Sequence, residues 1–246
     1  MRFDFSSIKV RDEDVEKYKG KTVAFVHAKG SSERVPSKNL RLLGDIPLFC
    51  HAIKNALGSE RVDLVVIDSD SDEILRIGQE HGAVALKRPR ELATNLATGD
   101  DLAYWQASNY PSSNVVLQVI PTAPFITSAS IDKAIQFLLD NPDTDSVAGV
   151  HEDVFYTWKD GRPAYYKADG TIPNSVDLPK VVYETTGLYI NRTAAVLKTG
   201  RRLNPSSCKP YVLSKLESVD INTIEDFEFA EMLLAGQRLL SSSSDK

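Results

Sequence analysis

The sequence predicts an α/β fold with a mostly parallel sheet and helices on both faces. Short, continuous apolar runs, of the kind found in buried parallel strands, alternate along the chain with segments of helical periodicity. This alternation is typical of βαβ units. With 246 residues, 42% of them hydrophobic and 26% charged, the chain has the length and composition of one large globular domain.

Each apolar run predicts one strand, and each periodic segment predicts one helix. The expected strands are 22–27, 64–67, 84–86, 115–120, 146–150 and 187–190. The expected helices are 47–57, 72–81, 100–109, 130–139 and 225–234. In 130–139, for example, apolar residues recur at positions i, i+3, i+4 and i+7, which places them on one helix face.

The domain boundaries are placed where this alternation of strands and helices begins, stops or is interrupted. Residues 1–20 are polar and are expected to form an N-terminal arm, and 21–238 form the main domain. Within it, 152–182 is rich in turn-forming residues, which predicts a hairpin-rich insertion that serves as a dimerisation element or a substrate lid. The serine-rich segment 239–246 is expected to be a disordered tail.

Charge and hydropathy exclude several classes of function. The formal net charge of −5 argues against broad nucleic-acid binding, so any anion site must be a local basic pocket. No apolar run approaches the roughly 18 residues that a membrane-spanning helix needs. The N-terminus has no apolar signal-peptide core, and two cysteines are too few for a disulfide framework. We therefore expect a cytoplasmic protein.

The most informative segment is the loop that follows the first expected strand. Residues 28–39 combine glycine and serines with the cations Lys29, Arg34 and Lys38. The backbone N–H groups and hydroxyls of such a loop can close around anionic oxygens while the cations offset their charge. The loop therefore predicts a polyphosphate site and, with it, a nucleotide-handling enzyme.

Seven segments resemble, in order, the motifs of the sugar-acid cytidylyltransferases, which make CMP-sialic acid, CMP-pseudaminic acid and CMP-legionaminic acid. The segment 28–40 resembles the family's "ARxxSKxxPxKN" loop, and 88–93 matches its "RPxELA" motif well. The others are 44–48 ("GxPL"), 68–74 ("STDxxxI"), 121–124 ("QPTSPLR"), 186–191 ("NGAIYI") and 217–227 ("ESIDIDTEEDF").

The resemblance implies a Rossmann-like nucleotide-diphospho-sugar transferase fold. It also implies that CMP is transferred from CTP to a 2-keto-3-deoxy sugar acid, with Mg²⁺ as the cofactor and pyrophosphate as the second product. In this reaction the anomeric hydroxyl attacks the α-phosphorus in line, so the protein's task is positioning and charge neutralisation. A further implication is a homodimer that forms through the insertion 152–182.

The family's motifs assign roles to residues of this sequence. Those expected to bind the nucleotide are Lys29, Gly30, Ser31, Ser32, Arg34, Lys38, Asn39, Asp70, Arg88 and Thr98. Those expected to bind the acceptor are Thr122, Glu184, Thr186 and Tyr189. Lys38 and Asp220 are the expected catalytic residues. Asp220 and Asn222 match the family's metal pair, and residues two apart on an extended segment project the same way, so both can meet one Mg²⁺.

Two of these residues keep a second interpretation. Asp70 either shapes the base pocket or caps the helix that follows it. Arg88 either reaches the nucleotide or forms a surface salt bridge.

Several positions depart from the family's pattern. Lys29 stands where the pattern has Arg, and Glu33-Arg34 stands where it has Lys-Gly, so the charges of the loop are redistributed. Asn222 replaces the second Asp of the metal pair, which predicts weaker Mg²⁺ binding or a shifted metal ligand. Glu184 stands in the family's "RxNG" segment, where a carboxylate would not hold the acceptor's carboxylate. We therefore expect a nonulosonic or octulosonic acid other than N-acetylneuraminate as the acceptor.

Two alternatives stay open at this point. One is a nucleotidyltransferase that uses another nucleotide or another acceptor. The other is a homologue that binds nucleotide without catalysis, an interpretation favoured by Glu33 and Asn222 because each weakens the binding of phosphate or metal.

Overall fold

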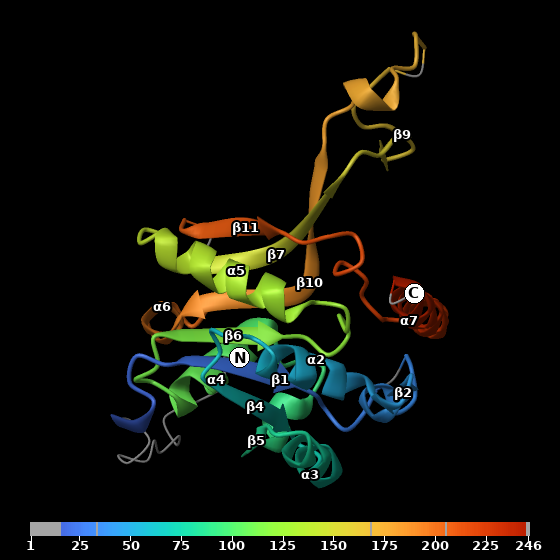
Figure 1. Ribbon diagram of the computed structural model, residues 1–246. Coiled ribbons are helices and arrows are strands. Elements are labelled where there is room, and N and C mark those ends of the chain that lie inside the picture. The colour runs from blue at the N-terminus through green and yellow to red at the C-terminus, as the bar shows by residue number, and fades with distance from the viewer. Residues whose placement is uncertain (1–15, 33, 168, 205, 245–246) are drawn as a thin grey trace.

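The computed structural model describes residues 16–32, 34–167, 169–204 and 206–244. In this part of the chain, seven strands form one sheet in the order β11-β7-β10-β6-β1-β4-β5 (Figure 1). Their bounds are β1 (Thr22–His27), β4 (Leu64–Ser69), β5 (Val84–Lys87), β6 (Val115–Val119), β7 (Ser146–Asp153), β10 (Val181–Arg192) and β11 (Cys208–Val212). Neighbouring strands of this described sheet run parallel except at β10, which is antiparallel to β6 and β7. The expected mostly parallel sheet is confirmed.

Helices cover both faces of the sheet, as expected. They are α2 (Leu48–Leu57), α3 (Asp72–Glu80), α4 (Gly99–Asn109), α5 (Ser128–Asp140), α6 (Thr193–Thr199) and α7 (Ile224–Ser244). Ala24 and Val26 of β1 belong to an apolar cluster with residues of α2, α3 and α5. Val23 and Phe25 belong to a second cluster, with residues of α4 and α6. Because side chains alternate across a strand, the buried run of β1 supplies the centre of both layers.

Side-chain caps explain where several of the helices begin. The hydroxyl of Ser71 accepts a hydrogen bond from the N–H of Ile74 at the start of α3, and Thr127 caps α5 in the same way. Before α2, the small hairpin of β2 (Leu42–Leu43) and β3 (Ile46–Pro47) turns the chain. The strands and helices predicted between residues 22 and 150 are all present, with ends shifted by a few residues.

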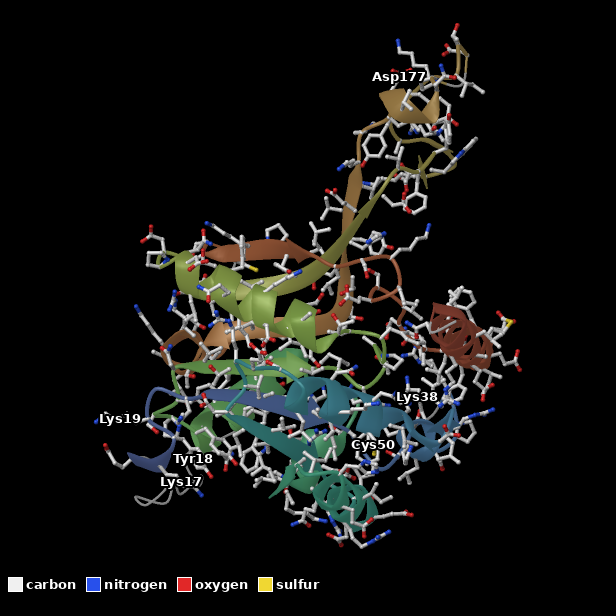
Figure 2. All side chains as sticks on the ribbon, viewed as in Figure 1. Lys17, Tyr18, Lys19, Lys38, Cys50 and Asp177 are labelled. Carbon is white, nitrogen blue, oxygen red and sulfur yellow. The ribbon has the colours of Figure 1, made fainter. Side chains whose placement is uncertain are left out.

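An arm projects from the body beyond β7 and β10 (Figure 1). These two strands stay paired as they leave the body, with Val181 opposite Asp153. The hairpin of β8 (Trp158–Lys159) and β9 (Arg162–Pro163) follows, together with the short 3-10 helix η3 (Ser175–Asp177). Asp177 marks the far end of the arm in Figure 2. The hairpin-rich insertion expected over 152–182 coincides with this arm.

The structure departs from the predicted elements after residue 180. Strand β10 begins at Val181, six residues before the predicted strand. The prediction begins late because most of residues 181–186 have exposed or half-buried side chains and form no apolar run. Helix α6 and strand β11 are not among the predicted elements. Strand β11 is short and carries no fully buried side chain, so it too lacks the pattern of a buried strand.

The predicted disordered tail 239–246 is wrong for residues 239–244, which continue helix α7. Extending an existing helix is easier than starting one, and Leu239 lines a surface cavity together with Gly44. Of the expected N-terminal arm, residues 1–15 lie outside the described residues, and Tyr18 packs edge-on against Tyr110 with ring centroids 5.0 Å apart. None of the described helices is both long and apolar enough to cross a membrane.

Candidate active site

A cavity of ≈ 510 Å³ lies beyond the carboxyl-terminal ends of β1 and β6, the edge at which open α/β sheets bind ligands. Its walls come from the loop after β1, the segment after β5 with the 3-10 helix η2 (Arg90–Ala93), and the segment after β6. The lining residues are His27, Lys29, Ser31, Ser32, Arg34, Lys38, Asn39, Arg88, Leu92, Thr94, Asn95, Ala97, Leu102, Ile120, Pro121 and Thr122.

Most of the residues predicted to bind a nucleotide lie in this wall, and Thr122 of the predicted acceptor site joins them. Four of the lining residues are cations, and no carboxylate belongs to the part of the wall that the structure describes. Such a wall favours an anionic ligand. Leu92 and Leu102 add an apolar surface that suits a ring. Glu33, whose charge was expected to oppose phosphate, lies outside the described residues.

Three hydrogen bonds at Lys29 and Gly30 help to hold the loop after β1 in place. The side-chain amide of Asn39 donates to the carbonyl oxygen of Lys29 at 2.9 Å, and Lys29 Nζ donates to Asn95 Oδ1 at 2.5 Å. The N–H of Gly30 donates to Asp70 Oδ1 at 2.9 Å. Asp70 therefore orders the loop, and the interpretation of Asp70 as the cap of α3 is wrong because Ser71 is the cap. Gly30 and Asp70 are not in the described cavity wall.

Arg88 is buried in the cavity wall, and its charge is balanced from behind. Its Nε donates to Asp68 Oδ1 at 2.9 Å, and its Nη2 donates to the Asp68 carbonyl oxygen at 2.8 Å. Asp68 Oδ2 accepts from Gln106 Nε2 at 2.8 Å, and Gln106 Oε1 accepts from Gln118 Nε2 at 2.9 Å. The salt bridge foreseen for Arg88 exists, but it is buried and not on the surface, because strand β4 places Asp68 inside the sheet.

Lys38 connects the loop to a distant part of the chain, on the side of the body that carries α7 (Figure 2). Its Nζ donates to the carbonyl oxygen of Ile221 at 2.9 Å. The N–H of Ile221 donates to the carbonyl oxygen of Thr122 at 2.9 Å. Burial lowers the pKa of Lys38, and the negative charge of Asp220 opposes this effect. The two residues predicted to be catalytic, Lys38 and Asp220, are thus brought together.

Asp220 has one carboxylate oxygen that is engaged and one that is not. Its Oδ2 accepts from Asn222 Nδ2 at 2.5 Å and from the Thr186 hydroxyl at 3.2 Å. Its Oδ1 is buried and has no hydrogen-bond partner among the residues that the structure describes. Asp220 and Asn222 therefore project toward each other, as expected for alternate residues of an extended segment.

Asp220 fits one ligand position of a Mg²⁺ site, whereas Asn222 turns its amide nitrogen, which is not a ligand atom, to Asp220. Within the described ranges, no group of three or more His, Cys, Asp or Glu side chains is placed to hold a metal. Mg²⁺ does not need such a group, because it usually keeps several waters and binds through one or two carboxylates and the phosphates of a substrate. The unpartnered Oδ1 of Asp220 is the ligand atom that this chemistry requires.

Three of the four residues predicted to bind an acceptor, Glu184, Thr186 and Tyr189, lie along β10. Thr186 adopts a positive φ of 56° where the pairing of β10 with β7 shifts register, and this bulge turns its hydroxyl to Asp220. Tyr189 is buried, and its hydroxyl donates to Glu184 Oε2 at 3.0 Å. Burial raises the pKa of Tyr189 to about 12, so the phenol stays a donor at neutral pH. Glu184 is therefore already engaged by its own strand.

Thr98, predicted to bind the nucleotide, is not in the described cavity wall. Its hydroxyl accepts from the N–H of Asp101 and its N–H donates to the Asp101 carboxylate, a capping box at the start of α4. Asp68 and Arg202 are among the residues of the region that were not predicted. Asp68 is a polar residue at the end of an apolar run, which is a usable signal, whereas Arg202 lies in a loop whose sequence has no distinguishing pattern.

Comparison with known proteins gives relatives of nearly the same length. The chain is 26% identical over 87% of its length to the pseudaminic acid cytidylyltransferase of Campylobacter jejuni, of which it covers 96%. It is 27% identical over 86% of its length to the CMP-N,N'-diacetyllegionaminic acid synthase of Legionella pneumophila, of which it covers 95%.

A solved structure shares the fold. The structure of a CMP:2-keto-3-deoxy-manno-octonic acid synthetase complexed with CTP superposes with a TM-score of 0.67 at 16% sequence identity, over 89% of this chain and 100% of that chain. The expected Rossmann-like nucleotidyltransferase architecture is confirmed. The profile of the family described as cytidylyltransferase matches residues 23–241. The chain therefore belongs to the cytidylyltransferase family.

Proposed function

We propose that this protein transfers CMP from CTP to an acidic keto-deoxy sugar and releases pyrophosphate. The observation that carries the proposal is the meeting of Lys38, Thr122 and the segment around Asp220 beside a cationic cavity, in a chain of the cytidylyltransferase family. Binding and orientation of the two substrates account for most of what such a reaction needs from a protein.

The cavity supports CTP as the donor. Lys29, Arg34 and Lys38 offer three positive charges to a triphosphate, and the serines of the same loop offer hydroxyls. Leu92 and Leu102 provide the apolar surface for the base. Because Asp68 balances the charge of Arg88, that guanidinium is better suited to a neutral acceptor atom, such as a carbonyl oxygen, than to phosphate.

Asp220, with Asn222 beside it, is the proposed Mg²⁺ site. When bound, the ion would neutralise the phosphate oxygens around which charge develops. Lys38 would place its ammonium on the same phosphates, since it lies close enough to Asp220 for the two charges to interact. Asn222 presents its amide nitrogen to Asp220, so its oxygen reaches a metal only after the amide turns over.

The acceptor that we propose is a nonulosonic or octulosonic acid other than N-acetylneuraminate. The relatives named above act, by their names, on pseudaminic and diacetyllegionaminic acids. The hydrogen bond of the Thr186 hydroxyl to Asp220 supports an acceptor site at the bulge of β10, and the Glu184–Tyr189 pair lies on the same strand. These groups suit hydroxyl and acylamino substituents, which both donate and accept hydrogen bonds.

We further propose that the protein is a homodimer. The arm exposes apolar and aromatic side chains along its length, an arrangement that a monomer in water disfavours. They are Phe155, Tyr156, Trp158, Tyr165, Ile172 and Val176. A second copy of the chain is the occupant that this proposal assigns to the arm.

Pyrophosphate release from CTP and Mg²⁺ tests the function, with a panel of keto-deoxy sugar acids as acceptors and the Asp220→Ala variant as the control. Release with one acid, abolished in the variant, is the expected result. If CTP binds but no acid gives release, the protein is a nucleotide-binding homologue and the proposal fails. Release with UTP or ATP in place of CTP would overturn the assignment of the nucleotide.

A further inference from the structure

Arg202 presents an unpaired guanidinium at the edge of the candidate site. It lies in the loop after α6, and its Cζ sits 3.9 Å from the centroid of the Tyr189 ring. Its backbone N–H donates to Asp100 Oδ1 at 3.0 Å, which ties the loop to the start of α4. Among the described residues, no carboxylate forms an ion pair or hydrogen bond with the guanidinium itself.

The start of α4 leaves room for the side chain of Arg202, and the carboxylate of Asp100 there binds the backbone N–H of Arg202. A Cβ at Gly99 would overlap Cζ and Nη1 of Arg202, so the absence of a side chain there lets the guanidinium lie against the first turn of α4. The start of a helix adds partial positive charge. A guanidinium stacked by its face on an aromatic ring keeps its N–H groups available at its edge, where a carboxylate can be bound through two hydrogen bonds.

Arg202 lies between the cavity and the acceptor side. After burial and the charge of Arg88, its charge is the next cause of the lowered pKa of His27, a residue of the cavity wall. The ring of Tyr189, on which it stacks, feels the charges of Glu184 and Asp220 as well. The guanidinium is therefore close to both the proposed CTP site and the proposed acceptor site.

The proposed acceptor carries a carboxylate, and the chain must offset that charge. Arg202 is not among the described residues of the cavity wall, and the cations that are either lie in the loop after β1, where the triphosphate needs them, or, as with Arg88, are already paired. Glu184 is acidic, and Thr186 and Tyr189 carry no charge at neutral pH. Resting on the proposed function, we propose that Arg202, held flat on Tyr189, binds the carboxylate of the sugar acid.

The first test compares Arg202→Met with Arg201→Met, which removes the same charge from the exposed neighbouring residue. With Arg202→Met, the KM for the sugar acid is expected to rise roughly 10- to 100-fold, the loss typical of a hydrogen bond to a charged group. The KM for CTP should stay unchanged, and Arg201→Met should behave like the unmodified protein. An unchanged KM for the acid in Arg202→Met would overturn the proposal.

A second variant separates carboxylate binding from a purely structural role. Gly99→Ala keeps Arg202 but displaces its guanidinium, and the shift is inexpensive because the overlapping atoms are the end of a flexible side chain. Its thermal stability should match that of the unmodified protein, while the KM for the acid rises. A normal KM together with normal stability would contradict the proposal.

An acceptor analogue identifies the group that Arg202 binds. The unmodified protein should have a lower KM for the acid than for its carboxamide, and Arg202→Met should lose most of this difference. Changing the protein and the acceptor together forms a double-mutant cycle, which isolates the interaction between Arg202 and the carboxylate. Equal preference in both proteins would assign the carboxylate to another residue. These outcomes are distinct from a failure of the proposed function, in which the unmodified protein releases no pyrophosphate with any sugar acid and both proposals fall.

Discussion

Lys38 donates a hydrogen bond of 2.9 Å to the carbonyl oxygen of Ile221, across a separation of 183 residues in the sequence. This bond brings the loop after β1 against the segment that carries Asp220. The ammonium of Lys38 keeps further N–H groups to offer to a ligand in the cavity, because one bond to a carbonyl uses only one of its three donors.

Lys38→Met should lower turnover without unfolding the protein. The variant loses a positive charge where we expect negative charge to develop, and removal of one such group costs roughly 10²- to 10³-fold in kcat. Pyrophosphate release measures this loss, and circular dichroism checks the fold. A folded variant with normal kcat would show that Lys38 only fastens the two segments together.

Asn222→Asp should tighten Mg²⁺ binding. A second carboxylate beside Asp220 adds attraction for the ion, and a tenfold lower Mg²⁺ concentration at half-maximal rate would correspond to about 1.4 kcal/mol. Without metal, the two carboxylates repel each other, so melting in EDTA should occur at a lower temperature than in the unmodified protein and should recover with Mg²⁺. If neither the rate nor the melting temperature responds differently to Mg²⁺, the pair is not the metal site.

Asp68→Ala should destabilise the protein severely. It leaves Arg88 buried without its carboxylate, and breaking a buried pair in this way costs about 3–5 kcal/mol. Asp72→Ala is the matched control, because Asp72 pairs with the neighbouring Lys87 on the surface, where a pair contributes less than about 1 kcal/mol. Urea unfolding of both variants measures the contrast, and equal losses would contradict the account of Arg88.

His27 should make stability fall with acidification. Burial, then the charges of Arg88 and Arg202, lowers its pKa from 6.5 to about 3 in the folded protein. Below pH 6.5 the unfolded chain binds a proton that the folded chain does not bind, so the free energy of unfolding falls until the pH reaches about 3.

His27→Gln should weaken this dependence between pH 6.5 and 3, whereas His81→Gln, at the end of α3, should leave it in place. Thermal melting across that pH range makes the comparison. The same slope in all three proteins would show that other groups cause the acid sensitivity.

Replacing the exposed aromatic residues of the arm should weaken the proposed dimer. Trp158→Ser with Tyr165→Ser removes two large anchors, and losses of this kind raise a dissociation constant by about 100-fold or more. Sedimentation equilibrium measures the change. Leu57→Ser, an exposed apolar position on the body, is the control and should leave association unchanged. A protein that is monomeric before any substitution would remove the basis of the proposal.

The sequence predicts the fold best where burial is continuous. Strands β1, β4 and β6 are apolar along almost their whole length, so their pattern depends little on what packs around them. The first half of β10 escapes prediction because Val182 and Tyr183 are exposed on the arm and show no buried face. The end of α7 escapes because serine composition indicates a tail, whereas an established helix extends through such residues.

The sequence also predicts only part of the candidate site. The cationic loop is local, so its residues were found from the sequence and most of them line the cavity. Arg88 pairs with Asp68, and Tyr189 packs against Arg202, and in each case the partner comes from another element of the fold. No spacing in the sequence predicts these two contacts. The family resemblance assigns Thr98 to the nucleotide, whereas its position before a helix favours capping, which is the role that its hydrogen bonds show.

The bulge in β10 also determines where this chain can change its length over evolution. On the sheet side of the bulge, one inserted or deleted residue would exchange Leu188 and Tyr189 between the two faces, so that an aliphatic side chain would lie under Arg202. Among descendants of this sequence, the number of residues from Thr186 to Tyr189 should therefore stay fixed.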